Sequence, residues 1–314
     1  MNCEQKKESL GFIVKDALTP ICGKKCVLLG VPYYMNIGDV LIWEGTLDFL
    51  KSQHIKCKRQ ASKETFTFPK LSIDTTILLQ GGGNFGDLWL AEQRFRTKVI
   101  QHYPQNRIII LPQTIFYSDR VLMENDAKVY AGHKDLFICA RDSSSYKILQ
   151  ANFHSNHNLL VPDMAFCISS SRLKLKPSAK PGTALLLKRK DKELKEFPFD
   201  RYIRTTTSVE SHDWPTYEGM QSVILKCEAW LWQYSHRFPR FFDWFMTNFF
   251  RPHLVSTGIR FLSRYSDVYT TRLHAAILCT LLDKPYTFFD NSYGKNASFY
   301  DTWLSDLGKV TFIR

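Results

Sequence analysis

An arginine and a histidine stand two positions apart in Thr271-Arg272-Leu273-His274, where a predicted strand gives way to an apolar helix. The first backbone N–H groups of a helix have no partner within it, so this end of a helix attracts anions. Arginine binds carboxylate or phosphate bidentately, and imidazole titrates near neutral pH. The segment predicts an anion site with a proton-transferring group; a histidine with a purely structural role is the alternative.

A second cationic segment, Lys188-Arg189-Lys190, follows a short apolar run at 184–187 that predicts a buried strand. Arg189 would then lie at the carboxyl end of that strand and face the same cleft as Arg272. Its guanidinium can hold an oxyanion with two parallel hydrogen bonds, so it is the most informative cation of the three. A solvated run of charge is the alternative.

The segment from Gly81 to Gly86 reads Gly-Gly-Gly-Asn-Phe-Gly and lies between a predicted strand and a predicted helix. It formally satisfies the G-x-G-x-x-G pattern of dinucleotide-binding proteins. That fingerprint, however, belongs to the first strand-turn of a domain and needs an acidic residue after the next strand, where Pro112 and Gln113 stand. We expect the glycines to bring backbone N–H groups to a ligand other than NAD or FAD, with a tight structural turn as the alternative.

Asn36-Ile37-Gly38-Asp39 follows the first predicted strand, at 25–30. Open α/β sheets bind ligands at the carboxyl ends of their strands, which favours this loop as part of a site. Asp39 is predicted to cap the helix that follows. Capping alone does not require Asn36 and Gly38 beside it, so we expect the loop to approach a ligand closely.

Alternating strands and helices are expected to position these segments. The predicted strands lie at 25–30, 76–80, 107–111, 136–139 and 184–187, near Ile203, and at 266–270 and 286–289. The predicted helices begin at Asp39 or lie at 88–102, 121–132, 142–152 and 272–282. Such alternation is typical of a parallel sheet covered on both faces. A Ser-, Lys- and Pro-rich stretch from Ser169 to Gly182 predicts a boundary between two α/β domains, 1–175 and 176–314.

Composition and charge exclude several classes of protein. The 314 residues carry 42 Lys and Arg against 30 Asp and Glu, a formal charge of +12, and 44% are hydrophobic. Disordered, collagenous and disulfide-rich small proteins are therefore excluded. The N-terminus lacks the apolar core of a signal peptide, and no stretch is long and apolar enough for a transmembrane helix. The eight scattered cysteines contain no CxxC pair, which predicts reduced thiols in a cytoplasm and no zinc site.

These segments together resemble the polysaccharide pyruvyl transferase family. The resemblance runs from Asn36–Asp39 through Gly81–Gly83 to the late motifs, of which Arg272-Leu273-His274 before an apolar helix is the sharpest. The other matching segments are Ala140-Arg141-Asp142-Ser143-Ser144, Val161-Pro162-Asp163, Leu187-Lys188-Arg189, Lys284-Pro285 and Lys295.

The resemblance implies a fold, a reaction and roles for residues. The fold would be α/β with two Rossmann-like domains facing a cleft, as in the GT-B glycosyltransferase architecture, with the acceptor side in 1–175 and the donor side in 176–314. The reaction would move the enolpyruvyl carbons of phosphoenolpyruvate onto two hydroxyls of one sugar, forming a ketal and releasing phosphate in capsule or exopolysaccharide biosynthesis. No cofactor or metal would be required.

By this resemblance the donor would be held by cationic side chains of the second domain, and His274 would act as general acid or base together with Arg272. The expected donor-binding residues are Arg189, Arg272, His274 and Lys295. The expected acceptor or cleft-loop residues are Asn36, Gly38, Asp39, Gly82, Gly83 and Asn84.

An aromatic and basic segment, Trp230–Arg251, lies outside the shared pattern and is read as an insertion at about 230–255. Its aromatic residues and Arg237, Arg240 and Arg251 are typical of a membrane-interface segment. Because sugars linked to polyprenyl diphosphate are suitable acceptors, we expect contact with the inner face of the cytoplasmic membrane. An aromatic core or an oligomer contact is the alternative.

Two other functions fit parts of the sequence. A GT-B glycosyltransferase that uses a nucleotide sugar would share the expected fold and could bind a diphosphate through Arg or Lys in the second domain. A non-enzymatic polyanion-binding protein would rest on the positive charge alone, without any nucleic-acid recognition motif. We therefore expect no nucleic acid among the partners.

Overall fold

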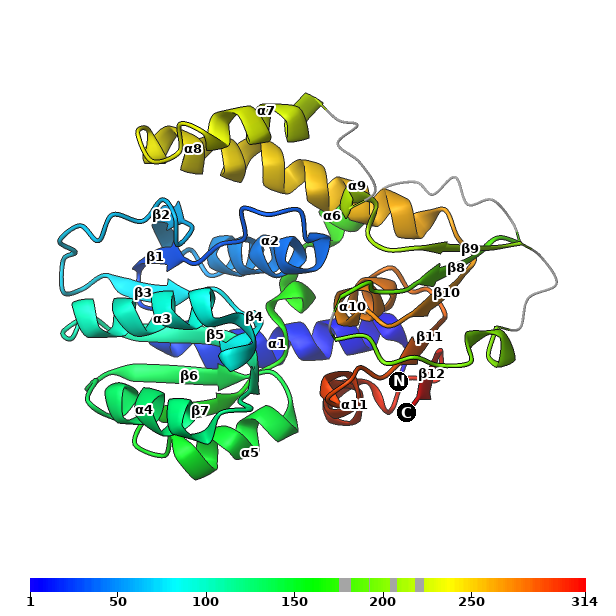
Figure 1. Cartoon of the computed structure of the whole chain (residues 1–314), viewed down its shortest axis with the longest axis horizontal. Helices are drawn as coiled ribbons and strands as arrows, with labels where there is room; N and C mark the ends of the chain where they lie inside the picture. Colours follow the sequence, from blue (N-terminus) through cyan, green and yellow to red (C-terminus); the bar gives the residue numbers. More distant parts are fainter. Residues whose placement is uncertain (175–181, 192, 204–207, 218–222) are drawn as a thin grey trace.

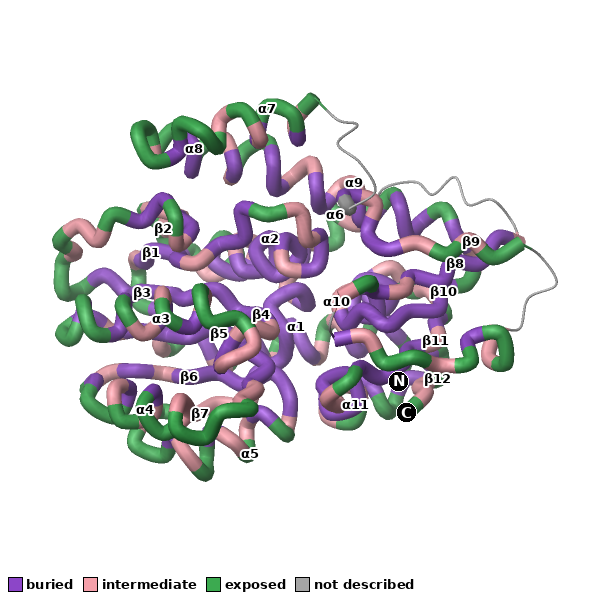
Figure 2. Tube along the Cα trace, in the orientation of Figure 1, coloured by how far each residue is buried: buried purple, intermediate pink, exposed green. Residues whose placement is uncertain are grey.

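The computed structural model describes residues 1–174, 182–191, 193–203, 208–217 and 223–314. Two sheets lie side by side, each made of parallel strands, with helices packed around and between them (Figure 1). Parallel strands are expected to be buried on both faces. Figure 2 shows this burial running through the centre of the molecule, with exposed residues on the outer helices.

The first sheet has the order β2-β1-β3-β5-β6-β7, and β4, which is not in this order, pairs with the last part of β5. Its strands are β1 (Lys25–Leu29), β2 (Lys56–Ala61), β3 (Thr76–Leu79), β4 (Gly82–Gly86), β5 (Ile108–Phe116), β6 (Leu136–Ala140) and β7 (His157–Leu160). The helices of this part are α1 (Cys3–Cys22), α2 (Ile37–Ser52), α3 (Leu90–His102), α4 (Arg120–Ala131), α5 (Ser143–Asn152) and α6 (Ser170–Leu173), with short 3-10 turns η1 (Asp87–Trp89) and η2 (Met164–Cys167).

Successive residues of the first sheet enter two different apolar clusters, as the period of two in a strand requires. Val27 and Leu29 of β1 pack with α3, α4 and α5 on one face. Cys26 and Leu28 of the same strand pack with α1 and α2 on the other face. The second cluster continues into α10 and the strands of the second sheet, so one apolar core joins the two sheets.

The second sheet has the order β12-β11-β10-β8-β9, again entirely parallel. Its strands are β8 (Ala184–Leu187), β9 (Val209–His212), β10 (Asp267–Thr270), β11 (Tyr286–Phe289) and β12 (Val310–Ile313). The helices are α7 (Val223–Trp232), α8 (Pro239–Phe245), α9 (Arg251–Ser263), α10 (Leu273–Leu281) and α11 (Lys295–Phe299), the 3-10 turns are η3 (Phe199–Arg201) and η4 (Pro215–Tyr217), and the π-helical segments are η5 (Met246–Phe250) and η6 (Tyr300–Leu304).

The alternating α/β pattern expected from the sequence is confirmed, with two parallel sheets compatible with two Rossmann-like domains. The predicted boundary between residues 175 and 176 lies outside the described residues. The strand expected near Ile203 is wrong in position, because the strand of this region is Val209–His212. The cap predicted at Asp39 is also wrong: Asn36 caps α2 by accepting a hydrogen bond from the Gly38 N–H, and Asp39 lies inside the first turn.

Several helices and strands of the structure were not predicted from the sequence. Helix α1 was missed although its buried residues recur every three or four positions, and it packs against α10 of the second sheet. Strands β2, β7 and β12 were also missed. Each is short and at most half-buried over much of its length, so each lacks the apolar run that identified the central strands.

Both sheets reverse their strand order at one point, and ligands of open α/β sheets bind outside the carboxyl ends of the strands there. In the first sheet the reversal lies between β1, which leads into the loop containing Asn36, and β3, which leads into β4 with Gly83. In the second sheet it lies between β8 and β10, which lead into Arg189 and Arg272. The topology therefore places the segments with Asn36 and Gly83 at the reversal point of the first sheet, and those with Arg189 and Arg272 at the equivalent point of the second.

Candidate active site

A cavity of about 290 Å³ lies where these segments meet. Its wall contains residues from both sheets: Tyr34, Asn36, Asp39, Gly83, Asn84, Trp89, Glu92, Arg141, Arg189, Asp191, Glu193, Trp214, Arg272, Leu273, His274 and Lys295. Four of these side chains are cationic and four are carboxylates, not counting the histidine. An anion would therefore be held here by oriented donors rather than by an excess of positive charge.

His274 lies in the first turn of α10 and is enclosed from three directions. Its Nε2 is 3.4 Å from Oδ2 of Asp163 and 3.4 Å from Nη1 of Arg141. Its ring also lies directly against the first turn of α2, since a Cβ built on Gly38 would be 2.7 Å from Nδ1. Gly38 thus allows the two helix ends to approach, and the imidazole is fixed between the two halves of the molecule.

Arg141 and Asp163 form a buried ion pair beneath His274, with Nη1 and Oδ2 2.8 Å apart and both side chains 1% exposed. Arg141 also donates through Nε to the Thr114 hydroxyl, 2.9 Å away. Burial alone would raise the pKa of Asp163, but its hydrogen bond to His274 and the charges of His274 and Arg141 hold that pKa far below the ordinary range. Asp163 is therefore a fixed carboxylate that orients the imidazole.

Arg189 follows β8 and is held by two carboxylates. Its Nε and Nη2 donate to the two oxygens of Asp191 at 2.7 and 3.1 Å, and its Nη1 donates to Glu193 at 2.8 Å. Lys295, at the start of α11, donates to the same oxygen of Glu193. Burial lowers the pKa of Lys295. Burial would raise the pKa of Glu193, but the positive charges of Lys295 and Arg189 have the larger effect and hold that pKa far below the ordinary range.

Arg272 precedes α10 and is paired with Asp213, which lies 59 residues earlier in the chain. Its Nε and Nη2 donate to the two carboxylate oxygens at 2.8 and 2.5 Å, and its Nη1 lies 3.4 Å from Asp191. The bidentate pair fixes the plane of the guanidinium. Asp191 therefore contacts both Arg189 and Arg272, so these two cations are oriented by one carboxylate.

The opposite wall of the cavity is formed by the loop after β1 and by β4. Asp39 accepts hydrogen bonds from the Asn36 amide at 2.8 Å and the Tyr34 hydroxyl at 2.9 Å. A Cβ on Gly83 would lie 3.0 Å from Nη2 of Arg141 and 3.7 Å from Nζ of Lys295, so this glycine permits close approach to two cations. The Asn84 side chain is held by Arg96 at 2.7 Å.

Most of the predicted site residues are brought together. Asn36, Asp39, Gly83, Asn84, Arg189, Arg272, His274 and Lys295 all line the cavity, whereas Gly38 and Gly82 do not. Gly38 instead supports His274, and Gly82 lies near Asp39 in a backbone conformation with φ of +145°. Gly81–Gly86 contains a strand rather than only a turn before a helix, because Gly82–Gly86 pairs with β5.

Other members of this site were missed as functional residues: Tyr34, Trp89, Arg141, Asp163, Asp191, Glu193, Asp213 and Trp214. A signal existed for two of them, since Arg141 comes directly after β6 and Asp163 shortly after β7. Asp213 also comes directly after a strand, β9, but that strand was expected near Ile203, so the sequence did not place Asp213 at a strand end.

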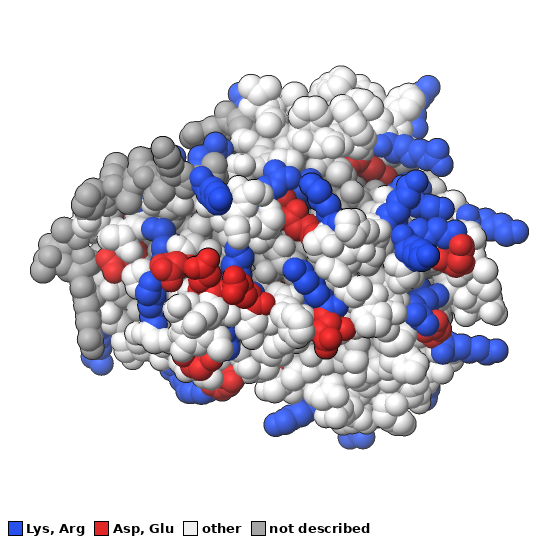
Figure 3. All heavy atoms as spheres, turned by 180° about the vertical axis from the view of Figure 1, so that it is seen from behind, with Lys and Arg blue, Asp and Glu red and all other residues white. Residues whose placement is uncertain are grey.

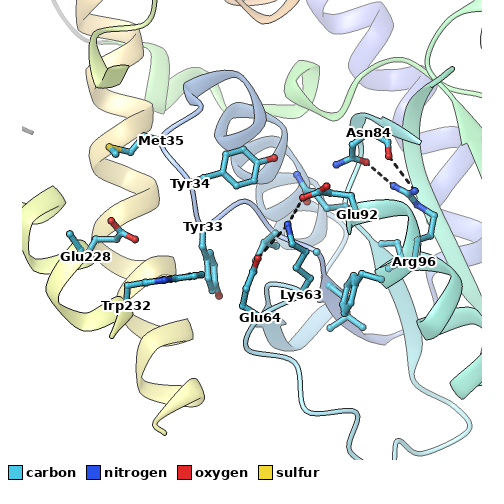
Figure 4. A pocket seen from close by; sticks show the side chains of 17 residues that line it. Tyr33, Tyr34, Met35, Lys63, Glu64, Asn84, Glu92, Arg96, Glu228 and Trp232 are labelled. Atoms are coloured by element: carbon cyan, nitrogen blue, oxygen red, sulfur yellow. Dashed lines mark hydrogen bonds and ion pairs between the residues drawn. The ribbon is translucent and has the colours of Figure 1, made fainter. Parts of the chain in front are cut away.

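A larger cavity of about 550 Å³ adjoins the first and shares Tyr34, Asn84 and Glu92 with it. Figure 4 shows its polar side chains: Lys63 contacts Glu64 and Glu92 on one wall, and Glu228 and Trp232 lie on the facing helix α7. Burial raises the pKa of the Glu228 carboxyl to about 7. The two cavities together extend from the strand ends to α7.

Two features are absent from the residues that the structure describes. No group of three or more His, Cys, Asp or Glu side chains is arranged there to hold a metal ion. No helix within the described ranges is long and apolar enough to cross a membrane.

Comparison with known proteins gives a consistent result. A model of the family described as polysaccharide pyruvyl transferase matches residues 36–293. EpsO of Bacillus subtilis strain 168, provisionally named a pyruvyl transferase, is 34% identical over 295 residues, covering 90% of this chain and 86% of that protein. Pyruvyl transferase 1 of Schizosaccharomyces pombe is 28% identical over 298 residues, covering 90% of this chain and 70% of that protein.

One solved structure has a similar fold along its whole length. It is the crystal structure of a Klebsiella pneumoniae protein of uncharacterised function, with a TM-score of 0.65 and 21% identity, covering 97% of this chain and 98% of the other. At this level of identity the similarity concerns the fold alone.

Proposed function

The chain belongs to the polysaccharide pyruvyl transferase family, and from this membership and the geometry of the smaller cavity we propose that it transfers pyruvate from phosphoenolpyruvate to a sugar. Two hydroxyls of one sugar receive the carbon skeleton as a ketal, and phosphate leaves. The observation that carries the proposal is the convergence of His274 with Arg189, Arg272 and Lys295 on one cavity. A proton-transferring group beside fixed cationic donors suits a substrate that bears both a carboxylate and a phosphate.

Arg189, Arg272 and Lys295 are the proposed donor-binding groups. Phosphoenolpyruvate presents two anionic groups on one small carbon frame, and two guanidiniums can each receive one oxyanion. The carboxylates Asp191, Glu193 and Asp213 hold these cations in place. These carboxylates also offset part of the positive charge of the cavity. A ligand must therefore match the directions of the N–H donors, which favours one small anion over polyanions in general.

His274 is the proposed general acid and base. A proton delivered to the methylene carbon makes a methyl group and leaves the adjacent carbon electron-poor, so that the first sugar hydroxyl attacks it. Loss of phosphate regenerates an oxocarbenium-like carbon, which the second hydroxyl attacks to close the ketal. Of the two hydroxyl protons, one balances the methyl group formed and the other leaves with phosphate. Asp163 orients the imidazole for these transfers.

The sugar acceptor is assigned to the loops of the first sheet and to the larger cavity. Asn36, Asp39 and Asn84 line the smaller cavity opposite the cations. Gly83 lines the same wall without a side chain, and Gly82 lies behind it near Asp39. Glu64 and Glu92 of the larger cavity can accept hydrogen bonds from hydroxyls, and Tyr34 and Trp232 offer apolar faces. An oligosaccharide linked to polyprenyl diphosphate is the proposed acceptor, at the cytoplasmic face of the membrane, for capsule or exopolysaccharide synthesis.

The scheme uses phosphoenolpyruvate as co-substrate, with no cofactor or metal. It is compatible with a cleft of the GT-B type between the two sheets. Such a fold would equally serve a nucleotide-sugar glycosyltransferase, so the test must separate the two reactions.

Incubation with phosphoenolpyruvate labelled with carbon-13 at carbon 2 and a panel of bacterial glycans tests the proposal. We expect the labelled carbon to appear as a ketal in the NMR spectrum, with one phosphate released per ketal. His274→Gln should reduce the rate by about 100-fold or more without unfolding the protein. Sugar transfer from a nucleotide sugar to the same glycans, without ketal formation, would overturn the proposal.

A further inference from the structure

An unusual number of large apolar side chains is exposed on α7, α8 and η5. We call residues 223–250 the aromatic hairpin. Eight of the sixteen exposed large hydrophobic side chains in the described residues lie on it: Val223, Trp230, Trp232, Tyr234, Phe238, Phe241, Trp244 and Phe249. Scattered surface hydrophobics are ordinary, but a concentration of this kind marks an interaction site. The alternative of an aromatic core does not hold for these eight side chains.

The inner side of the aromatic hairpin is firmly attached to the first sheet. Asp243 of α8 accepts hydrogen bonds from the hydroxyls of Tyr33 and Thr65 at 3.0 and 2.5 Å, and it pairs with Arg59 at 3.2 Å. The Phe242 ring packs edge-on against Tyr33 with centroids 5.6 Å apart. These contacts fix the orientation of the aromatic hairpin, and with it the direction of its exposed side chains.

The exposed charges of the aromatic hairpin have one sign. Its exposed ionisable residues are Lys226, His236, Arg237 and Arg240, whereas its two acids, Glu228 and Asp243, are buried on the inner side. Seen from behind, the upper part of the molecule is largely uncharged with Lys and Arg at its margins (Figure 3). Arg240 also lines a shallow hollow with Phe238, Phe241 and Arg59.

We propose that the aromatic hairpin docks on the surface of a lipid bilayer that contains anionic lipid. Trp and Tyr side chains favour the interface between headgroups and acyl chains, and Phe inserts just below it. Each Arg or Lys near an anionic membrane contributes about 1 kcal/mol of attraction. The net charge of +12 acts in the same direction.

A second copy of the chain fits this surface less well. A twofold dimer would place the same patch on both partners, so that Arg237 and Arg240 of each copy would enter one shared interface. Like charges brought together in an apolar interface cost several kcal/mol. The charge pattern therefore favours an anionic surface over self-association.

Docking would have a consequence for the reaction, and this consequence alone rests on the proposed function. Glu228, Ala229 and Trp232 of the aromatic hairpin form one wall of the larger cavity. The mouth of the assigned acceptor site would therefore lie beside the membrane plane. An acceptor saccharide carried on a lipid could enter the cavity while its lipid stays in the bilayer.

Co-sedimentation with vesicles tests the docking itself, without substrate or activity. We expect wild-type protein to bind vesicles of equal parts phosphatidylglycerol and phosphatidylcholine at low salt, and pure phosphatidylcholine at least 10-fold more weakly. Phe241→Ser combined with Trp244→Ser should reduce binding by about 10-fold or more. Arg237→Gln combined with Arg240→Gln should reduce it about 30-fold on anionic vesicles, or about fivefold for each charge.

Phe12→Ser is the matched control, because Phe12 is a similarly exposed ring, on α1. It should leave binding unchanged, while circular dichroism verifies that all variants are folded. Brominated lipid provides a local readout: it should quench tryptophan fluorescence, and Trp244→Phe should reduce that quenching. Failure of the folded wild-type protein to bind at low salt would overturn the proposal. A concentration-dependent dimer that Phe241→Ser dissociates, without vesicle binding, would overturn it in favour of self-association.

Discussion

At the scale of single residues, the position of His274 depends on neighbouring groups to which the proposed reaction gives no proton-transfer step. Gly38 offers no side chain where the imidazole lies, and Asp163 holds Nε2 from the other side. Arg141 fixes Asp163 in turn. The proposed proton transfer thus depends on the closeness of two helix ends, α2 and α10, as much as on the histidine.

Gly38→Ala is predicted to reduce kcat by about 10- to 100-fold, because a methyl group 2.7 Å from Nδ1 forces the imidazole to move. The same variant should lower the free energy of unfolding by only about 1–3 kcal/mol. Steady-state kinetics and thermal unfolding measure the two effects separately. Gly132→Ala is the control, since its added methyl would meet only the Val129 carbonyl oxygen at 3.4 Å. Unchanged kcat in Gly38→Ala would refute the positioning role.

Glu228 gives a prediction about pH. Burial raises its pKa from 4.5 to about 7, so the folded state binds this proton more tightly than the unfolded state. The stabilisation by the neutral acid is complete below about pH 4.5 and is lost as the pH rises to about 7. Glu228→Gln should therefore raise Tm by about 2–5 °C at pH 8.5 and leave it nearly unchanged at about pH 4.5.

Differential scanning calorimetry at both pH values checks this prediction, with Glu8→Gln on the exposed side of α1 as the control. Equal shifts in Tm at the two pH values would mean that Glu228 acts through packing rather than through ionisation.

At the scale of elements, the site is assembled from the carboxyl ends of parallel strands. The central strands were predictable because each is a short, mostly buried run that is rich in apolar residues; Ala184–Leu187 and Tyr286–Phe289 have the predicted bounds. Helix α1 was not predicted, since lysines and glutamates lie between its apolar positions. Its buried face became recognisable only against α10.

The part of the site that could be predicted consists of residues that follow these predictable strands. Residues that come within two positions of a strand end, such as Arg189 and Arg272, can be assigned to one edge of a sheet without knowledge of the loops. Asp213 was not assigned, because the strand before it, Val209–His212, was expected near Ile203, and its contact with Arg272 lies 59 positions away in the chain. Likewise, Glu193 forms ion pairs with both Arg189 and Lys295, and Lys295 comes next to it only through the folding of the chain.

Packing of α2 against η2 gives a prediction for an element. A Cβ on Gly45 would lie 2.0 Å from the Met164 carbonyl oxygen, a backbone atom that cannot rotate away. Gly45→Ala should therefore lower the free energy of unfolding by about 2–3 kcal/mol, or Tm by about 5 °C. Thermal unfolding measures this, with Gly308→Ala as the control, because no atom lies within 4 Å of its added methyl. An unchanged Tm in Gly45→Ala would contradict the close packing described here.

At the scale of the whole molecule, the apolar core joins two parallel sheets whose strand orders reverse at comparable positions. The cations of the second sheet face the polar loops of the first across one cavity. This arrangement suits a reaction in which an anionic donor and a polar acceptor must meet. The aromatic hairpin forms one wall of the larger cavity, and we propose that it attaches this end of the molecule to a bilayer surface.

The most direct test of the central claim is thermal unfolding in the presence of phosphoenolpyruvate, with UDP, a UDP-sugar and NAD in parallel. Ligand at about 100 times its Kd stabilises a protein by about 2.7 kcal/mol, which moves Tm by several degrees. Arg272→Lys keeps a cation opposite Asp213 but removes the bidentate fork, and Arg120→Ala on the exposed side of α4 is the control. We predict a shift with phosphoenolpyruvate alone, preserved in Arg120→Ala and lost in Arg272→Lys; a shift with UDP or the UDP-sugar and none with phosphoenolpyruvate would contradict the account.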